Sequence, residues 1–152
     1  FHASNAYLGL LLFAVVFAIS AVAQPAAGRL SDAVSRDFAI ATSATLTATA
    51  FVVLLAVEGS VGLYAGPALL GAGISWPGTV QARVMDQLSA GERGFGFGLV
   101  RAVYRLPAVA GSVVVGALAD YGGWVPADGV VILLLLGGLC ALGTNRALGL
   151  DL

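Results

Sequence analysis

Five long apolar stretches constrain this chain more than any other feature of its sequence. A helix rises about 1.5 Å per residue, so about 20 apolar residues are needed to cross a hydrocarbon core about 30 Å thick. The stretches lie at about residues 7–27, 38–57, 61–80, 95–119 and 127–145. Each is apolar all round, unlike a surface helix of a soluble bundle. The sequence therefore predicts an all-α, polytopic bundle of five transmembrane helices.

The composition agrees with a bilayer as the surroundings of the chain. Hydrophobic residues make up 59% and charged residues 10% of the sequence, against about 45–50% and about 25% in soluble domains. A formal net charge of −1 offers no basic excess for binding nucleic acid. The sequence contains a single His and a single Cys, which excludes a multi-cysteine metal site and a His cluster for metal binding or for a Ser-His-Asp relay. We expect no metal, no cofactor, no nucleic acid partner and no enzymatic activity.

The arginines predict an orientation in the membrane. Alternate connections hold all the arginines that lie between the stretches, and the acidic residues of the remaining connections have no basic neighbours. The arginines are Arg29, Arg36, Arg83 and Arg93, with Arg146 after the last stretch, and the acidic residues are Glu58, Asp120 and Asp128. By the positive-inside rule, the arginine-containing connections are cytoplasmic. We expect a multi-pass cell-membrane protein with its N-terminus outside and its C-terminus in the cytoplasm.

The first stretch also allows a different interpretation. An apolar run that ends in AVAQ resembles a secretory signal with a small-residue cleavage site. No basic segment precedes the run, however, and four further stretches require the same membrane, which favours a transmembrane helix. The odd number of spans and the initial Phe1 lead us to expect a piece of a longer protein.

A polar segment, GRLSDAVSRD at residues 28–37, separates the first two apolar stretches. Its polarity keeps a tight turn between two helices out of lipid, and this alone would account for it. The spacing of its residues favours a more specific interpretation. Four positions resemble the loop signature that joins the second and third helices of each half in the major facilitator superfamily: Gly28, Leu30, Asp32 and Arg36. The segment departs from that signature at Ala33, Ser35 and Asp37.

Two further segments resemble the same family in the same order. LSAGERGFGFGLVRAVYR, residues 88–105, is similar to the entry into the eleventh helix, and GALADYGGW, residues 116–124, is similar to the turn into the twelfth. The resemblance implies that residues 1–152 are a partial C-terminal transmembrane domain, similar to helices eight to twelve. The missing N-terminal half would then be a partner of this chain.

The resemblance also implies a function. Transporters of this family move a small solute by alternating access, with or without a coupling proton or cation, as two rigid halves rock around a central site. In the family, the Asp of the loop signature faces the end of a helix in the opposite half, where the helix dipole favours a carboxylate. For Asp32 that helix would belong to the missing half, so this fragment could not gate alone.

Two arginines inside the fourth stretch are candidates for solute binding. Arg101 and Arg105 lie four residues apart, on one helix face, and Arg105 would lie about 15 Å from a helix start near Phe95. An arginine at that depth costs at least about 2.5–3.5 kcal/mol, so it should face protein or water. Arg105 would bind an anionic group of the solute and Arg101 would snorkel or support the gate. Alternatively, the helix begins earlier and both pair with backbone carbonyls or Asp86.

Three other residues are candidates for contact with the solute. Tyr64 and Trp76 belong to the third stretch, whose prolines and glycines predict a bent, closely packed helix that is similar to a cavity-lining helix of the family. Aromatics near span ends more often lie at the membrane interface, and that role is favoured over solute contact for both residues. Gln24, near the end of the first stretch, would present an amide. The threonines of the second stretch look like a polar site, but such hydroxyls commonly bond back to their own helix, and packing is the better explanation.

Two other classes of function compete with transport. One is a small non-transporting membrane protein that assembles with a partner, which the odd number of spans favours. The other is an intramembrane enzyme, but the predicted spans hold no His and only scattered Ser and Thr. The segment GFGFG at residues 94–98 has the wrong spacing for a dinucleotide fingerprint. Transport of a small solute is therefore the function that the sequence favours.

Overall fold

Helices account for almost all of the chain. The structure, a computed structural model, describes residues 2–89 and 91–149, and the side chains of 7–89 and 91–149 apart from residue 107. The helices in chain order are α1 (His2–Ala33), α2 (Arg36–Ala56), α3 (Gly59–Gly73), α4 (Trp76–Asp86), α5 (Arg93–Gly122) and α6 (Trp124–Leu148). No strand occurs in the described ranges. The prediction of an all-α membrane fold is confirmed.

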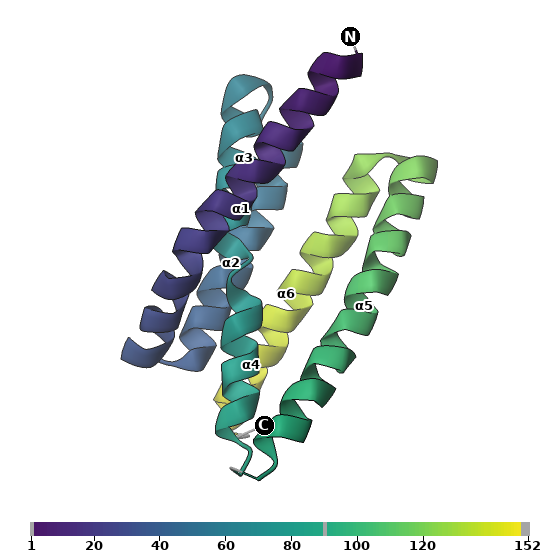
Figure 1. Ribbon diagram of the computed structural model, residues 1–152. Helices are drawn as coiled ribbons and strands as arrows, with labels where there is room; N and C mark the ends of the chain where they lie inside the picture. Colours follow the sequence, from purple (N-terminus) through teal and green to yellow (C-terminus); the bar gives the residue numbers. More distant parts are fainter. Residues whose placement is uncertain (1, 90, 150–152) are drawn as a thin grey trace.

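Four of the helices are long and apolar enough to cross a bilayer: α1 from Tyr7 onward, α2, α5 and α6. They correspond to the first, second, fourth and fifth predicted stretches, and each extends beyond its predicted range at one or both ends. The third stretch, 61–80, was predicted as one bent helix, and this was wrong. It is interrupted at Ile74 and Ser75, and α3 and α4 run one after the other in the same direction (Figure 1).

The interruption has a local cause. Pro77 lacks a backbone N–H and is favoured in the first turn of a helix, where the N–H groups have no partner within the helix. The Ser75 hydroxyl donates a hydrogen bond to the carbonyl of Ala72 at 3.1 Å and lies 3.1 Å from the Ser43 hydroxyl of α2. A new helix therefore starts at Trp76, and the break is held against α2.

The α3 helix packs closely because its buried residues are small. Gly62, Gly66, Pro67, Gly71 and Gly73 are all buried. A Cβ added at Gly71 would lie 2.6 Å from the backbone oxygen of Val16 in α1, and one added at Gly73 would lie 2.6 Å from the backbone nitrogen of Thr47 in α2. Two backbones therefore approach α3 at distances that leave no room for a side chain.

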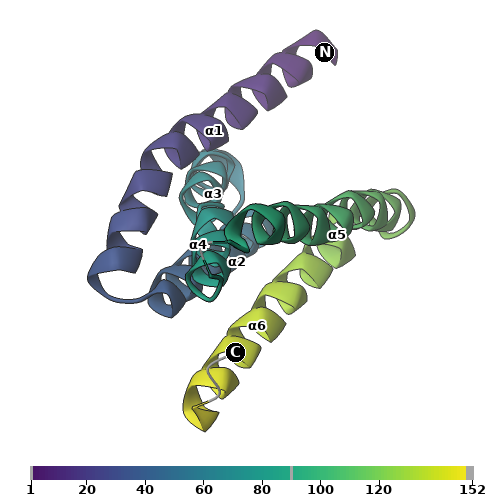
Figure 2. The ribbon, with the colours of Figure 1, turned by 60° about the horizontal axis from the view of Figure 1, so that its bottom comes forward.

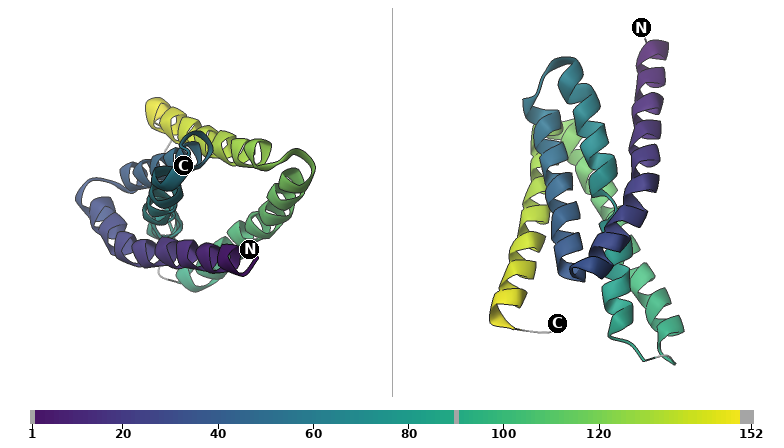
Figure 3. Two further views of the ribbon diagram at one scale, coloured as in Figure 1. Left: turned by 90° about the horizontal axis from the view of Figure 1, so that it is seen from above. Right: turned by 90° about the vertical axis from the view of Figure 1, so that its left-hand side faces the viewer.

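The remaining helices surround this contact. Viewed from above, α1 lies on one side of the α2–α3–α4 cluster and α6 on the other (Figure 3). The α6 helix packs against α2 and α5, whereas α5 packs against α6 and α4. The connection between α5 and α6 is a tight turn at Gly123, whose φ of 82° lies in the region that glycine adopts without strain. Figure 2 shows the α5–α6 hairpin diverging from α1.

The arginine-containing connections gather at one end of the bundle. The α1–α2 connection, the α4–α5 connection and the end of α6 all lie at the lower end of Figure 1, and the α2–α3 and α5–α6 connections lie at the upper end. We call the lower end the arginine-rich end. It contains Arg29, Arg36, Arg83, Arg93 and Arg146. The predicted alternation of arginine-containing connections therefore corresponds to a gathering of these arginines at one end of the bundle.

The threonines of α2 behave as the sequence predicted. Each of four hydroxyls donates to the carbonyl four residues earlier, at 2.8 or 2.9 Å; they belong to Thr42, Thr45, Thr47 and Thr49. These bonds satisfy the hydroxyls within the helix. The row of threonines is therefore explained by local hydrogen bonding, without a bound ligand.

Candidate gating site

The polar segment at 28–37 contains the predicted turn between two helices, but the turn is confined to two residues and the rest of the segment is helical. The α1 helix continues through Pro25 as far as Ala33, and only Val34 and Ser35 connect it to α2. Ser35 has an extended backbone, and its hydroxyl accepts a hydrogen bond from the N–H of Phe38 at 3.1 Å, which caps α2. The family's signature residues therefore lie on the last two turns of α1 and the first turn of α2.

Arg36 is the centre of the site. Its Nη1 donates to Oδ1 of Asp32 at 2.8 Å and to the hydroxyl of the buried Ser31 at 2.9 Å. Its Nε donates to Oδ2 of Asp86, at the end of α4, at 3.0 Å. One guanidinium thus joins the end of α1 to the end of α4, and its fixed fork of donors suits such a bridge.

A second ion pair also joins α2 to α4, but with the positive charge on α4 and the negative charge on α2. Arg83 of α4 donates through Nη1 to Oδ1 of Asp37. Both side chains are about three-quarters buried, with exposed fractions of 22% and 26%. In one pair the arginine belongs to α2 and the carboxylate to α4, and in the other pair the charges are exchanged. We call Asp32, Arg36, Asp37, Arg83 and Asp86 the ion cluster.

The ion cluster explains a departure from the family's signature. Position 37 is usually basic in that signature, whereas here it is Asp37. Arg83 supplies the compensating positive charge from α4. Sequence reasoning missed the roles of Asp37 and Arg83, although the reversed charge at 37 was a usable signal for an unusual partner. It considered Asp86 only as a partner of Arg101 or Arg105, and the structure pairs Asp86 with Arg36 instead.

A polar cavity of about 240 Å³ lies beside the ion cluster, between α1 and α4. Its polar lining residues are Gln24, Ser31, Arg36, Ser75 and Thr79. Gln24 Nε2 donates to the Ser20 hydroxyl at 3.2 Å. Gly28 also lines this cavity, whereas Leu30 lies in another cavity beside Thr42 and Leu46 of α2. The predicted Gln24 and the predicted signature residues Gly28 and Arg36 are thus brought together.

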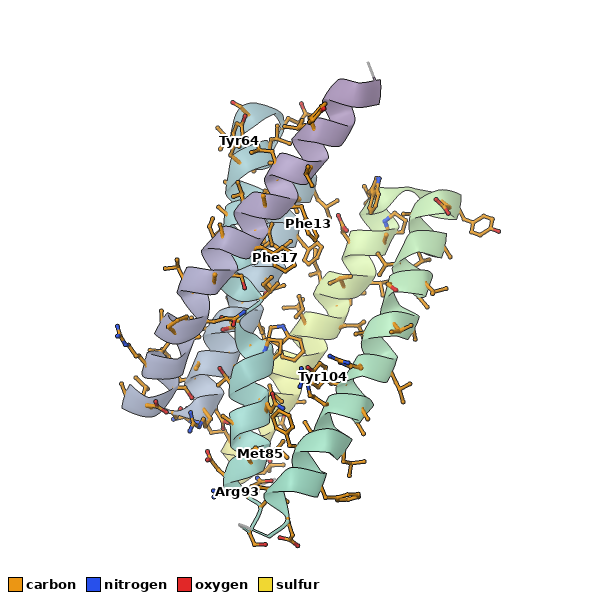
Figure 4. The ribbon with its side chains drawn as sticks, viewed as in Figure 1. Phe13, Phe17, Tyr64, Met85, Arg93 and Tyr104 are labelled. Carbon is orange, nitrogen blue, oxygen red and sulfur yellow. The ribbon has the colours of Figure 1, made fainter. Side chains whose placement is uncertain are left out.

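The other predicted solute-binding residues are dispersed. Trp76 lines a larger cavity on the side of α4 that faces α6. Tyr64 lies near the upper end of α3, away from the arginine-rich end (Figure 4), and is 55% exposed. Arg101 and Arg105 are exposed on α5, and the Arg101 guanidinium lies 5.5 Å from the centre of the Phe97 ring. Neither cavity is lined by Tyr64, Arg101 or Arg105.

Hydrogen bonds between Ser89 and Glu92 stabilise the α4–α5 connection. The carboxylate of Glu92 accepts hydrogen bonds from the hydroxyl of Ser89 at 2.5 Å and from its N–H at 3.1 Å. These bonds favour the ionised carboxylate and lower the pKa of Glu92. These two hydrogen bonds to the ionised carboxylate are therefore present at neutral pH and are lost only as the pH falls through the lowered pKa of Glu92.

Among the described residues no group of three metal-ligating side chains occurs.

A bundle of apolar helices with an ion cluster at one end defines a membrane-embedded protein. The family model of the Major Facilitator Superfamily matches residues 1–148. This chain therefore belongs to the major facilitator superfamily, whose members are transporters rather than enzymes. No curated protein and no solved structure matches it.

Proposed function

We propose that this chain forms the C-terminal part of a secondary transporter that moves a small solute by alternating access, with the ion cluster as part of its cytoplasmic gate. The observation that carries the proposal is the bridge made by Arg36. It holds the segment that bears the family's loop signature against α4, within a chain that belongs to the family. The arginine-rich end would face the cytoplasm, with the N-terminus outside.

The exposure of two carboxylates of the ion cluster supports a role in gating. Side chains of Asp32 and Asp86 are 69% and 59% exposed, although both pair with Arg36. Their carboxylates are therefore accessible to a further partner, such as the helix end of a second half. Ion pairs of this exposure contribute little stability and exchange readily with water. A contact of this kind suits a gate that must open and close repeatedly.

The proposal that this chain is one part of a larger transporter has a direct test. An antibody against the segment RALGLDL, residues 146–152, would detect the native product in membranes. We expect a product about two to three times the length of this chain, because two six-helix halves make up a transporter of this family. A product of 152 residues would contradict the proposal and favour the alternative, a small non-transporting membrane protein that assembles with a partner.

Arg105 is the residue that we propose to bind an anionic group of the solute or a coupling carboxylate. It lies about 18 Å along α5 from Arg93, which would put it near the middle of a bilayer if the membrane begins near Arg93. Arg105→Ala in the full-length protein is expected to lower solute uptake by about tenfold or more. Arg105→Lys is expected to retain part of the uptake, because the lysine ammonium keeps the positive charge but lacks the planar guanidinium group.

Arg93→Ala, at the start of the same helix, is the matched control and is expected to leave uptake within about twofold of the wild type. Surface expression of each variant would be measured in parallel. Normal uptake by both Arg105 variants would show that this residue does not bind the solute. Arg101, Tyr64, Trp76 and Gln24 would then be tested in the same assay.

A further inference from the structure

A cavity between α2, α4 and α6 is separate from the polar cavity and shares only Arg83 with the ion cluster. Its volume is about 540 Å³. Most of the lining is apolar: Ile40, Ala44, Trp76, Val80, Leu134, Leu135, Gly138, Leu139, Ala141 and Leu142. Two polar residues, Arg83 and Asn145, complete it. We call this cavity the α6 groove.

The two polar residues lie at one end of the α6 groove. Both α4 and α6 run toward the arginine-rich end, and Arg83 and Asn145 are the last lining residues of their helices in that direction (Figure 1). Trp76 and Leu134 line the opposite end. The groove is therefore amphipathic along its length, with its polar end at the edge of the membrane and its apolar end toward the bilayer interior.

The length of the groove corresponds to one leaflet of a bilayer. Leu134 and Asn145 are eleven residues apart on α6, which is about 16 Å of helix. Half of a hydrocarbon core about 30 Å thick is about 15 Å. A volume of about 540 Å³ spread over that length gives a mean cross-section of about 34 Å². An extended chain with a polar end therefore suits the groove in length.

The polar end carries the chemistry of a headgroup site. Oδ1 of Asn145 is buried and has no hydrogen-bond partner among the described residues. A buried acceptor without a donor is unfavourable, so a bound group that donates to it would be stabilising. Arg83 lies at the same end, and Arg146 follows Asn145 directly in the last turn of α6. Arg83 also pairs with Asp37, and both arginines lie at the level along the helices where a headgroup phosphate of this leaflet would lie. Guanidinium groups bind phosphate well.

We infer that the α6 groove binds one phospholipid of the leaflet at the arginine-rich end. One acyl chain lies along the apolar lining, and the headgroup phosphate lies at the level of Arg83 and Arg146. The inference goes beyond solute transport, because it concerns a lipid that remains bound between α6 and the α2–α4 side of the bundle.

Two adjacent glycines provide a matched pair of variants. Gly138 lines the groove, Gly137 does not, and a Cβ at either position meets nothing within 4 Å. Native mass spectrometry of the full-length protein, purified in mild detergent, would count retained phospholipids. We expect Gly138→Phe to retain one phospholipid fewer than the wild type and Gly137→Phe to retain the wild-type number. Equal retention by all three proteins would overturn the inference.

A second measurement detects the lipid through the fluorescence of Trp76, which lines the groove. The protein would be reconstituted with phosphatidylglycerol brominated in the middle of its acyl chains. The fluorescence that belongs to Trp76 is the part lost in Trp76→Phe. We expect the brominated lipid to quench that part of the fluorescence in the wild type. We expect Gly138→Phe to abolish this quenching and Gly137→Phe to leave it unchanged. An unquenched Trp76, or a protein helix seen in the groove by electron microscopy, would show that no lipid occupies it.

Discussion

Arg83→Asp in the full-length protein is expected to lower solute uptake by about tenfold or more. The substitution places two carboxylates, at positions 83 and 37, where an ion pair now joins α4 to α2. Like charges at such a distance repel, and both side chains are about three-quarters buried, so water screens them only in part. A tenfold change corresponds to about 1.4 kcal/mol. Uptake into cells or vesicles, corrected for surface expression, is the measurement.

The exchanged pair is the decisive control for this effect. Adding Asp37→Arg to Arg83→Asp restores opposite charges and is expected to recover uptake to within about threefold of the wild type. Arg29→Asp changes charge by the same amount at the same end of the bundle, and Arg29 forms no ion pair with the described residues. It should have little effect. Equal losses for Arg29→Asp and Arg83→Asp would indicate a general effect of charge on topology.

The second large effect is expected at Gly71. In Gly71→Ala the new Cβ would lie 2.6 Å from the backbone oxygen of Val16 and 3.0 Å from Cβ of Ile19. Backbone cannot move aside as a flexible side chain can, so α1 and α3 must separate. Overpacking of this kind costs about 1–3 kcal/mol. We expect a clear fall in the thermal unfolding midpoint of the purified protein, measured by fluorescence in detergent.

Gly116→Ala is the control for the intrinsic preference of a helix for alanine. Gly116 lies inside α5, and an added Cβ there meets nothing within 4 Å. Alanine is favoured over glycine in a helix interior by about 0.5–1 kcal/mol, so this variant should be as stable as the wild type or slightly more stable. An equal stability of Gly71→Ala would mean that α1 and α3 are not in close contact in the full-length protein.

The sequence predicted the helices well because a membrane span depends on a single local property. A run of about 20 apolar residues is visible without knowledge of its neighbours. The interruption at Ile74 and Ser75 was less visible, because Pro67 and Pro77 look alike in the sequence. Pro67 remains inside α3, whereas Pro77 begins α4. The difference involves the contact between the hydroxyls of Ser43 and Ser75, which are 32 residues apart.

For a similar reason, only Asp32 and Arg36 of the ion cluster were predicted as gating residues. Asp32 and Arg36 lie four residues apart, and their spacing carried the resemblance to the family. Asp37 and Arg83 are 46 residues apart, and only the packing of α4 beside α2 makes them partners. The polar cavity likewise gathers Gln24 and Arg36 with Ser75 and Thr79 from a distant helix. The roles of Arg101 and Arg105 remain predictions.

The break at Ile74 and Ser75 divides the third apolar stretch into two parts that are held by different forces. Above it, α3 is fixed by close contact between backbones, which dissolved ions do not affect. Below it, α4 is tied to α1 and α2 by ion pairs, which are screened over about 8 Å at physiological ionic strength. A rise in salt at the arginine-rich end would therefore weaken the exposed ion pair between Arg36 and Asp86 more than the buried pair between Arg83 and Asp37, and would leave the backbone contacts of α3 unchanged.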